Sequence, residues 1–260
     1  WPILQTVSLS KLLFSTAWRP LSGEFGLATF IIGTLWVTGV AMLIAVPLSL
    51  LTAIYLAEYA PQRVRGALKP VLDILAAIPS VVYGLFGLLV IVPLSGKMAA
   101  FLGVASSAYN VLSGGLVLAI MVLPVIITIS DEVIRTVPQG MREAAMSVGA
   151  TRWEATKMVV GRGALPGVLA AVILGFSRAF GETMAVLMVV GNVARVPSSV
   201  FDPAYPLTAL IANNYGEMMS IPLYDSALLL AALVLLIIVF AFSLAARVIL
   251  VRLERRYSPA

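Results

Sequence analysis

Two residues of opposite charge, Arg178 and Glu182, stand four positions apart in an apolar stretch of the sequence. A charge at the centre of a membrane-spanning helix costs roughly 2.5–3.5 kcal/mol on insertion scales, so its presence needs a reason. On a helix these two side chains lie one turn apart and can pair. A guanidinium also presents a planar fork of donors that suits the oxygens of a phosphate-like anion. One interpretation is a polar pathway in which Arg178 contacts an anion and Glu182 orients it. The other is an ion pair that locks two helices together.

Three hydroxyl groups accompany this pair. Ser80 and Tyr83 follow Pro79, and Thr183 follows Glu182. A proline inside a helix frees a carbonyl and often breaks the helix, and broken helices that line a cavity present dipoles and hydroxyls to a transported solute. The sequence therefore adds Ser80, Tyr83 and Thr183 to the candidate substrate pathway. The alternative is a simple kink followed by glycines that serve helix packing, Gly84 and Gly87.

The composition places these residues in a membrane protein. Of the 260 residues 61% are hydrophobic and 11% are charged, and the mean hydropathy is +1.04, more apolar than a soluble domain of this size can bury. The chain has no Cys and no His. This excludes disulfides, thiol nucleophiles, imidazole bases and the commonest metal ligands, so we expect no metal site and no catalytic residues.

Five stretches are long and apolar enough to span a bilayer, which takes about 20 residues. We expect them at about 29–56, 71–93 (with Pro79 inside), 115–129, 168–190 (with Arg178 and Glu182 inside) and 227–250. Residues 1–27 are interrupted by charges, Pro and Gly. They are expected to form an external amphipathic segment whose apolar residues can lie in the membrane interface: Ile3, Leu4, Leu12, Leu13 and Phe14. The expected domains are thus 1–27, a transmembrane domain at 28–252 and a tail at 253–260.

The distribution of Lys and Arg sets the expected orientation. Twelve of the seventeen lie in the connections after the first and third spans or at and beyond the end of the fifth, and four lie in the alternate connections: Lys11, Arg19, Lys97 and Arg195. The positive-inside rule places the richer set in the cytoplasm. The C-terminus and the connection at 131–164 are then cytoplasmic and the N-terminus is external. An external N-terminus without a signal segment leads us to expect a sixth, N-terminal span beyond this sequence.

The cytoplasmic connection contains Glu143-Ala144-Ala145, with Gly149-Ala150 following. Paired alanines make a slim helix face that another chain can approach closely. Glu143 near a helix start is favoured by the macrodipole, and Gly149 can end the helix in a left-handed conformation. This pattern predicts a short helix that docks on a partner. An ordinary amphipathic loop helix is the alternative.

This loop resembles the EAA loop of ABC importer permeases, and other motifs extend the resemblance. They are Ser22-Gly23-Glu24-Phe25-Gly26, Ala77-Ile78-Pro79-Ser80-Val81-Val82-Tyr83-Gly84 and Arg178-Ala179-Phe180-Gly181-Glu182-Thr183-Met184-Ala185-Val186. From about Ser8 onward the chain is similar to the permease subunits of bacterial phosphate-specific ABC importers, of the PstC type rather than the sister PstA type. One feature departs from the pattern, because Leu165-Pro166 stands four residues beyond the usual Leu-Pro position of the loop.

The resemblance implies an all-α membrane protein, a polytopic helix bundle of the type I ABC importer permease kind, in the bacterial cytoplasmic membrane. It implies a docking role for Glu143, Ala144, Ala145, Gly149 and Ala150, and phosphate transport by alternating access. The implied partners are two ATPase subunits (PstB type), a second permease subunit (PstA type) and an external phosphate-binding protein (PstS type). The chain lacks a Gly-x-x-x-x-Gly-Lys-Ser/Thr loop, so ATP and Mg²⁺ belong to the partner ATPase and this chain binds no cofactor of its own.

Two alternatives stay open at this point. The same machine could carry another oxyanion, such as sulfate or molybdate. A secondary transporter working without ATP would need inverted repeats and coupling acids inside its spans. The sequence shows one acid deep within a predicted span, Glu182, since Asp73 stands only two residues inside the second, and no clear repeat.

Overall fold

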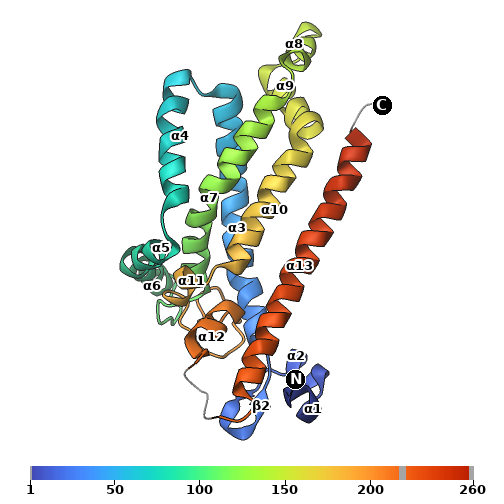
Figure 1. Cartoon of the computed structure of the whole chain (residues 1–260). Helices are drawn as coiled ribbons and strands as arrows, with labels where there is room; N and C mark the ends of the chain where they lie inside the picture. Colours follow the sequence, from blue (N-terminus) through green and yellow to red (C-terminus); the bar gives the residue numbers. More distant parts are fainter. Residues whose placement is uncertain (1, 217–220, 258–260) are drawn as a thin grey trace. The chain divides into compact units, whose positions relative to one another are not determined.

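The computed structural model describes residues 2–216 and 221–257, with side chains at all of these except 4, 249–250 and 253–257. Five helical stretches in this part of the chain are long and apolar enough to cross a membrane (Figure 1): Ala28–Tyr59, Ser80–Phe101, Val111–Thr136, Arg152–Gly181 and Tyr224–Val248. The predicted all-helical architecture with five spans is confirmed. The described residues add one small sheet, an antiparallel pairing of β1 (Trp18–Arg19) with β2 (Glu24–Phe25).

Three of the five spans contain a π-helical segment. The helix α3 (Ala28–Ile54) continues as a π-helix over Tyr55–Tyr59. Another joins α5 (Ser80–Phe86) to α6 (Val92–Phe101), and a third joins α9 (Arg152–Met158) to α10 (Leu165–Gly181). Each π segment ends two residues before a proline, which is Pro61, Pro93 or Pro166. A proline has no N–H for the carbonyl four residues earlier and its ring clashes with that carbonyl. In all three cases this carbonyl lies inside the π segment, where the wider turn accommodates it.

The second span differs from its prediction. It begins at Ser80 and not near residue 71, because the chain leaves the helix at Ile78 and Pro79, whose ψ angles are 130° and 141°. The residue before a proline is pushed out of the helical region, so Pro79 lies before the span and not inside it. The preceding helix α4 (Gln62–Ala77) carries Arg63, Arg65 and Lys69 and buries none of its residues.

The fourth span also differs. It extends back to Arg152 and ends at Gly181, whereas the predicted span continued through Glu182 to residue 190. The Glu182 carboxylate accepts a hydrogen bond from Ala185 N (3.2 Å) at the start of the short helix α11 (Met184–Leu187). The sequence Gly-Glu-Thr therefore ends one helix and begins another, as glycine and side-chain capping favour.

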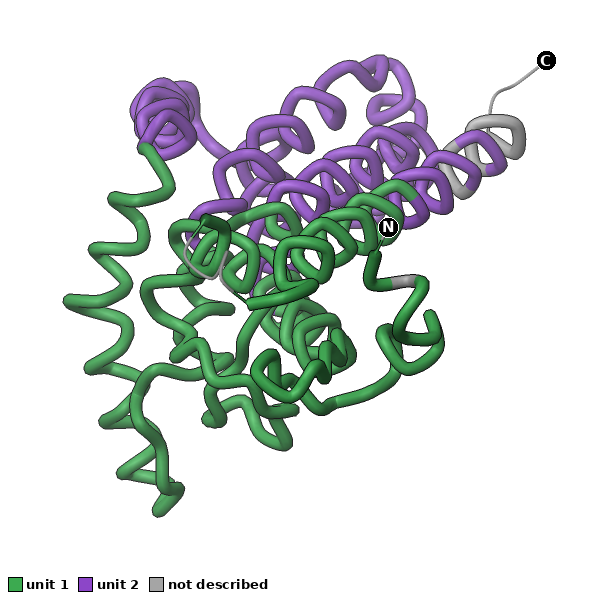
Figure 2. The backbone as a smooth tube through the Cα atoms, turned by 60° about the horizontal axis from the view of Figure 1, so that its bottom comes forward, with its two compact units in different colours: residues 1–43, 79–119, 179–240 green, residues 44–78, 120–178, 241–260 purple. Residues whose placement is uncertain are grey.

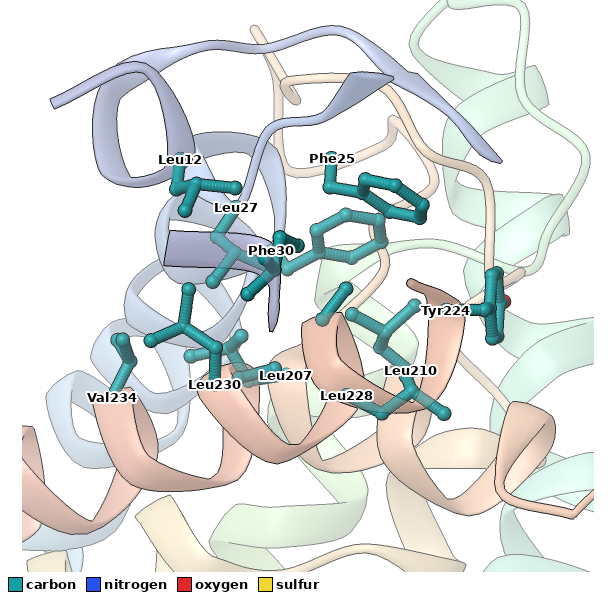
Figure 3. Close-up of a cluster of buried hydrophobic side chains, with 13 residues drawn as sticks. Leu12, Phe25, Leu27, Phe30, Leu207, Leu210, Tyr224, Leu228, Leu230 and Val234 are labelled. Atoms are coloured by element: carbon teal, nitrogen blue, oxygen red, sulfur yellow. The ribbon is translucent and has the colours of Figure 1, made fainter. Parts of the chain in front are cut away.

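The chain divides into two compact units, residues 1–43, 79–119 and 179–240 (unit 1) and residues 44–78, 120–178 and 241–260 (unit 2) (Figure 2). Unit 1 is built around an apolar core to which the N-terminal residues contribute through α1 (Pro2–Thr6), α2 (Leu9–Phe14) and the hairpin (Figure 3). In this core Leu12, Phe25 and Phe30 pack with residues of α12 (Leu207–Asn214) and of the first turns of α13 (Tyr224–Tyr257).

The N-terminal residues therefore differ from a segment lying in the membrane interface. Ile3 and Leu12 are buried, at 2% and 1% exposure, while Phe14 is 80% exposed; the side chain of Leu4 lies outside the described part. The ring of Trp18 makes edge-on contacts with Phe25, Phe30 and Tyr224, with centroids 5.0–5.9 Å apart. The sequence pattern missed this because the partners on α12 and α13, such as Leu207, Leu210 and Tyr224, lie far from residues 1–27 along the chain.

Unit 2 is held by a close helix pair. A Cβ added at Gly163, Gly167 or Gly175 of the α10 stretch would come within 2.4–2.9 Å of Val137, Val133 or Ile126, respectively. The reversed order of these partners makes α10 antiparallel to α7 (Val111–Thr136). Glycines one or two turns apart let backbones approach closely, the usual basis of helix association in membranes.

Candidate docking and permeation sites

The predicted docking loop contains a helix, α8 (Gln139–Ser147). It begins after Pro138, four residues earlier than expected, so Glu143 lies in the middle of the helix and not at its start. Gly149 has φ +89°, and it closes the helix as predicted. Its N–H bonds the Met146 carbonyl at 3.0 Å and the Ala150 N–H bonds the Ala145 carbonyl at 3.2 Å, the pattern of a Schellman cap.

The helix α8 exposes small and apolar residues beside Glu143. Glu143, Ala144 and Gly149 are exposed, Ala145 and Ala150 are partly exposed, and Val148 is 84% exposed. None of the residues of α8 is buried. Shortly after it, Trp153 is half exposed, and α9 opens with a capping box between Thr151 and Glu154. Small and apolar residues exposed beside one another are suited to close contact with another chain.

One ion pair ties α8 to the end of the first span. The Arg142 guanidinium donates from Nη2 to Glu58 Oε1 (2.6 Å) and from Nε to both carboxylate oxygens (3.0 and 3.1 Å). The same guanidinium donates to the carbonyls of Val137 (2.7 Å) and Ile134 (3.0 Å), at the end of α7. The Glu58 side chain is 8% exposed and that of Arg142 is 19% exposed, so the pair is largely removed from solvent.

Three further arginines converge on the same helix end. Arg65 donates to the carbonyls of Leu56 (2.6 Å) and Ala57 (3.2 Å), Arg135 donates to Leu56 (3.3 Å) and Arg152 donates to the Glu58 carbonyl. The last carbonyls of a helix have no partner within it and attract positive charge. Arg152 also lies 4.8 Å from the centre of the Tyr59 ring. The end of the first span is thus held by cations from three later segments.

A cavity of about 630 Å³ opens beside these contacts. Its lining combines the end of the first span with α8 and α9 and includes Glu58, Arg135, Arg142, Glu143, Met146 and Arg152. Sequence reasoning missed Glu58 and treated these arginines only as markers of topology. The available signal was one acid, Glu58, at the end of an apolar span facing a loop rich in arginine.

Four of the five predicted pathway residues lie in unit 1. Ser80 and Tyr83 belong to α5, Glu182 and Thr183 lie directly before α11, and α5 packs on α11. A Cβ at Gly84 would meet Met188 Sδ at 2.6 Å and Ala185 Cα at 3.1 Å. The structure brings these two segments together through glycine, so the packing role weighed for Gly84 is present. Tyr83 is 5% exposed, whereas Ser80 and Thr183 are partly exposed.

Arg178 lies in unit 2, in the last turn of α10, with an exposed side chain. The predicted one-turn spacing to Glu182 does not hold, because α10 ends at Gly181. The Glu182 carboxylate instead caps α11, and the Glu182 carbonyl accepts from Thr208 Oγ1 at 3.0 Å. Among the described residues no group of three or more His, Cys, Asp or Glu side chains could hold a metal ion.

Comparison with known proteins identifies the family to which the chain belongs. Residues 45–259 match the model of the binding-protein-dependent transport system inner membrane component. The phosphate transport system permease protein PstC of Xylella fastidiosa is 40% identical over 97% of this chain and 81% of its own length. The probable ABC transporter permease protein YqgH of Bacillus subtilis is 38% identical over 94% of this chain and 79% of its own.

Solved structures resemble the fold at low sequence identity. A chain of the inward-facing MetNI methionine ABC transporter is 19% identical, with a TM-score of 0.64, over 85% of this chain and 93% of its own. A chain of an amino acid ABC transporter with histidines is 20% identical, with a TM-score of 0.58, over 86% and 92%. These structures support the arrangement of helices alone.

Proposed function

The chain belongs to the family of binding-protein-dependent transport system inner membrane components, and from this premise we propose that it is the phosphate-carrying permease subunit of an ATP-driven importer. It is a multi-pass inner membrane protein of an ABC importer, and such a permease works with ATPase and binding-protein partners. The observation that supports phosphate as the substrate is the 40% identity, over nearly the whole chain, to a permease named for phosphate transport. The exposed helix α8, on a chain without an ATPase domain, supports the proposal that a partner ATPase subunit powers transport.

We assign the partners by type. The proposed complex contains two ATPase subunits, a second and different permease subunit, and an external phosphate-binding protein. The face of α8 formed by Ala144, Ala145 and Val148 and closed by Gly149 contacts one ATPase subunit. In this proposal α8 and the C-terminus both lie on the cytoplasmic side of the membrane. We also propose a role in the substrate pathway for each of Arg178, Glu182, Ser80, Tyr83 and Thr183.

Uptake measurements test the substrate. The chain is produced with its partner subunits in a bacterium that lacks its own high-affinity phosphate permease, and labelled phosphate uptake is measured. We expect uptake that vanadate abolishes and that a large excess of sulfate or molybdate leaves unchanged. Competition by sulfate or molybdate would assign another oxyanion. Uptake that continues without the ATPase would replace the importer class with a secondary transporter.

A charge on the docking face tests the contact with the ATPase. Gly149→Asp places a carboxylate on this face at a left-handed residue, and we expect uptake to be lost and the ATPase no longer to co-purify. Gly103→Asp is the matched control, since Gly103 also has a positive φ (+68°) and open space around it but lies in a predicted external connection. Normal uptake by Gly149→Asp contradicts the docking assignment.

A further inference from the structure

The docking helix α8 has little hydrophobic attachment to the rest of unit 2. None of its nine residues is buried. Met141 is partly buried and packs against the nearby core cluster around Ala53 and Ile134. A helix of this length is not stable by itself in water. Its position therefore depends on the two chain connections and on polar contacts made by its side chains.

Arg142 supplies the strongest of these contacts. Among the described residues its bond to Glu58 is the one ion pair that links α8 to another element. The same guanidinium caps the end of α7 through two carbonyls. A planar fork that makes several short bonds at once fixes orientation as well as distance, so a displacement of α8 pulls on both helix ends.

Glu58 is held firmly in place by its burial and by hydrogen bonds to its neighbours. Its carboxylate is largely buried, its carbonyl is held by Arg152, and the two preceding carbonyls are held by Arg65 and Arg135. Its neighbour Tyr59 adds a hydroxyl contact to Thr156 of α9 at 3.3 Å. The π-helical end of the first span is therefore restrained by the elements on both sides of the docking helix.

We propose that Glu58 is a positioning residue that carries the displacement of the docking helix α8 to the first span, whose π-helical end (Tyr55–Tyr59) contains it. This inference rests on the proposed function, because it takes α8 as the ATPase contact. It adds a defined route: the movement of the ATPase subunits is passed from α8 to the first span through one guanidinium and one carboxylate. Loss of the carboxylate leaves α8 on its partner but loosens its hold on α3.

The test compares transport with ATP hydrolysis. The full complex is reconstituted in proteoliposomes, and phosphate moved per ATP hydrolysed is measured for Glu58→Gln and Glu58→Ala. We expect both variants to co-purify with the ATPase and to lose about tenfold or more of this ratio, since a largely desolvated charge pair has been broken. Glu132→Gln is the control. It removes the 3.8 Å pair of Glu132 with Lys69, which involves neither α8 nor an arginine that holds the end of the first span, and it should keep the ratio.

A cross-link distinguishes transmission from folding. The chain has no cysteine, so Glu58→Cys with Arg142→Cys can be bridged by a bifunctional thiol reagent with a spacer. We expect a low ratio before bridging and recovery after it, in the same protein sample. An unchanged ratio in Glu58→Gln, or no recovery on bridging, overturns the proposal.

Failure of the proposed function gives a different result. If Gly149→Asp binds the ATPase and transports normally, α8 is not the docking helix, whatever Glu58 does. If Gly149→Asp loses the ATPase while Glu58→Gln keeps the wild-type ratio, docking holds and transmission through Glu58 is wrong. Loss of ATPase co-purification in Glu58→Gln also overturns the inference, because Glu58 then only shapes α8.

Discussion

Arg178 lies in the last turn of α10 with an exposed side chain, and its proposed role depends on the fork of the guanidinium. Arg178→Lys keeps the charge and loses the bidentate geometry. We expect phosphate uptake to fall about tenfold or more, because a hydrogen bond to a charged group contributes roughly 1.5–3 kcal/mol, while the complex still assembles. Arg162→Lys, at an exposed position of the same helical stretch, should transport normally. Wild-type uptake by Arg178→Lys excludes the fork from the pathway.

Two substitutions of Glu182 distinguish its role as a helix cap from a role in transport. Glu182→Gln keeps an oxygen for the Ala185 N–H and removes the charge, whereas Glu182→Met removes both. We expect Glu182→Gln to retain thermal stability and Glu182→Met to lose about 1 kcal/mol, the usual effect of losing a cap. A pathway role for the charge predicts impaired uptake in both variants. Full uptake by Glu182→Gln would leave capping as the role of this residue.

Single residues were predictable where the backbone constrains them. The positive φ of Gly149 follows from its place after a helix and from the absence of a Cβ. The Glu58–Arg142 pair was not predictable, because its members stand 84 positions apart and nothing local joins them. The one-turn relation of Arg178 to Glu182 was wrong because a local cap at Glu182 outweighed the continuity of the apolar pattern.

At the scale of elements, the glycines of the α10 stretch set the distance to α7. Gly167→Ala would place a Cβ 2.4 Å from Val133 Cγ1, while a Cβ at Gly161 meets nothing within 4 Å. We expect Gly167→Ala to destabilise the purified protein by about 1–3 kcal/mol through overpacking and Gly161→Ala to have little effect. Thermal unfolding in detergent measures the difference. Equal melting temperatures would show that the α7–α10 contact is not close-packed.

The spans were predictable to the extent that hydropathy alone decides them. The first and third agree with their predictions and have wider bounds, and the fifth agrees with its start and its end both slightly earlier. The second and fourth failed at polar or proline-containing breaks inside apolar sequence, at Ile78-Pro79 and at Glu182-Thr183. Hydropathy sums over a window and does not register where backbone geometry interrupts a helix.

At the scale of the whole molecule, charge is divided between the two units. Four of the seventeen basic residues, Lys11, Arg19, Lys97 and Arg195, belong to unit 1, and the other thirteen belong to unit 2. Twelve of the thirteen in unit 2 are the residues that the positive-inside rule places in the cytoplasm, and the thirteenth is Arg178.

Cysteine labelling tests this orientation, since the chain has no cysteine of its own. Ser107→Cys and Gln62→Cys place thiols at exposed positions on opposite predicted sides. In intact cells an impermeant thiol reagent should label Ser107→Cys and spare Gln62→Cys, and a permeant reagent should label both. The reverse pattern contradicts the orientation and removes the ATPase contact from α8.

The glycine contacts between α7 and α10 also limit how these helices can move. Gly163, Gly167 and Gly175 receive Val137, Val133 and Ile126 at intervals of whole helical turns. A small slide of one helix along the other drives each branched side chain onto a neighbouring backbone, and the next equally good register lies about 5.4 Å away. We therefore expect the two helices to move together along this contact, and the bending that transport requires to occur elsewhere in the chain.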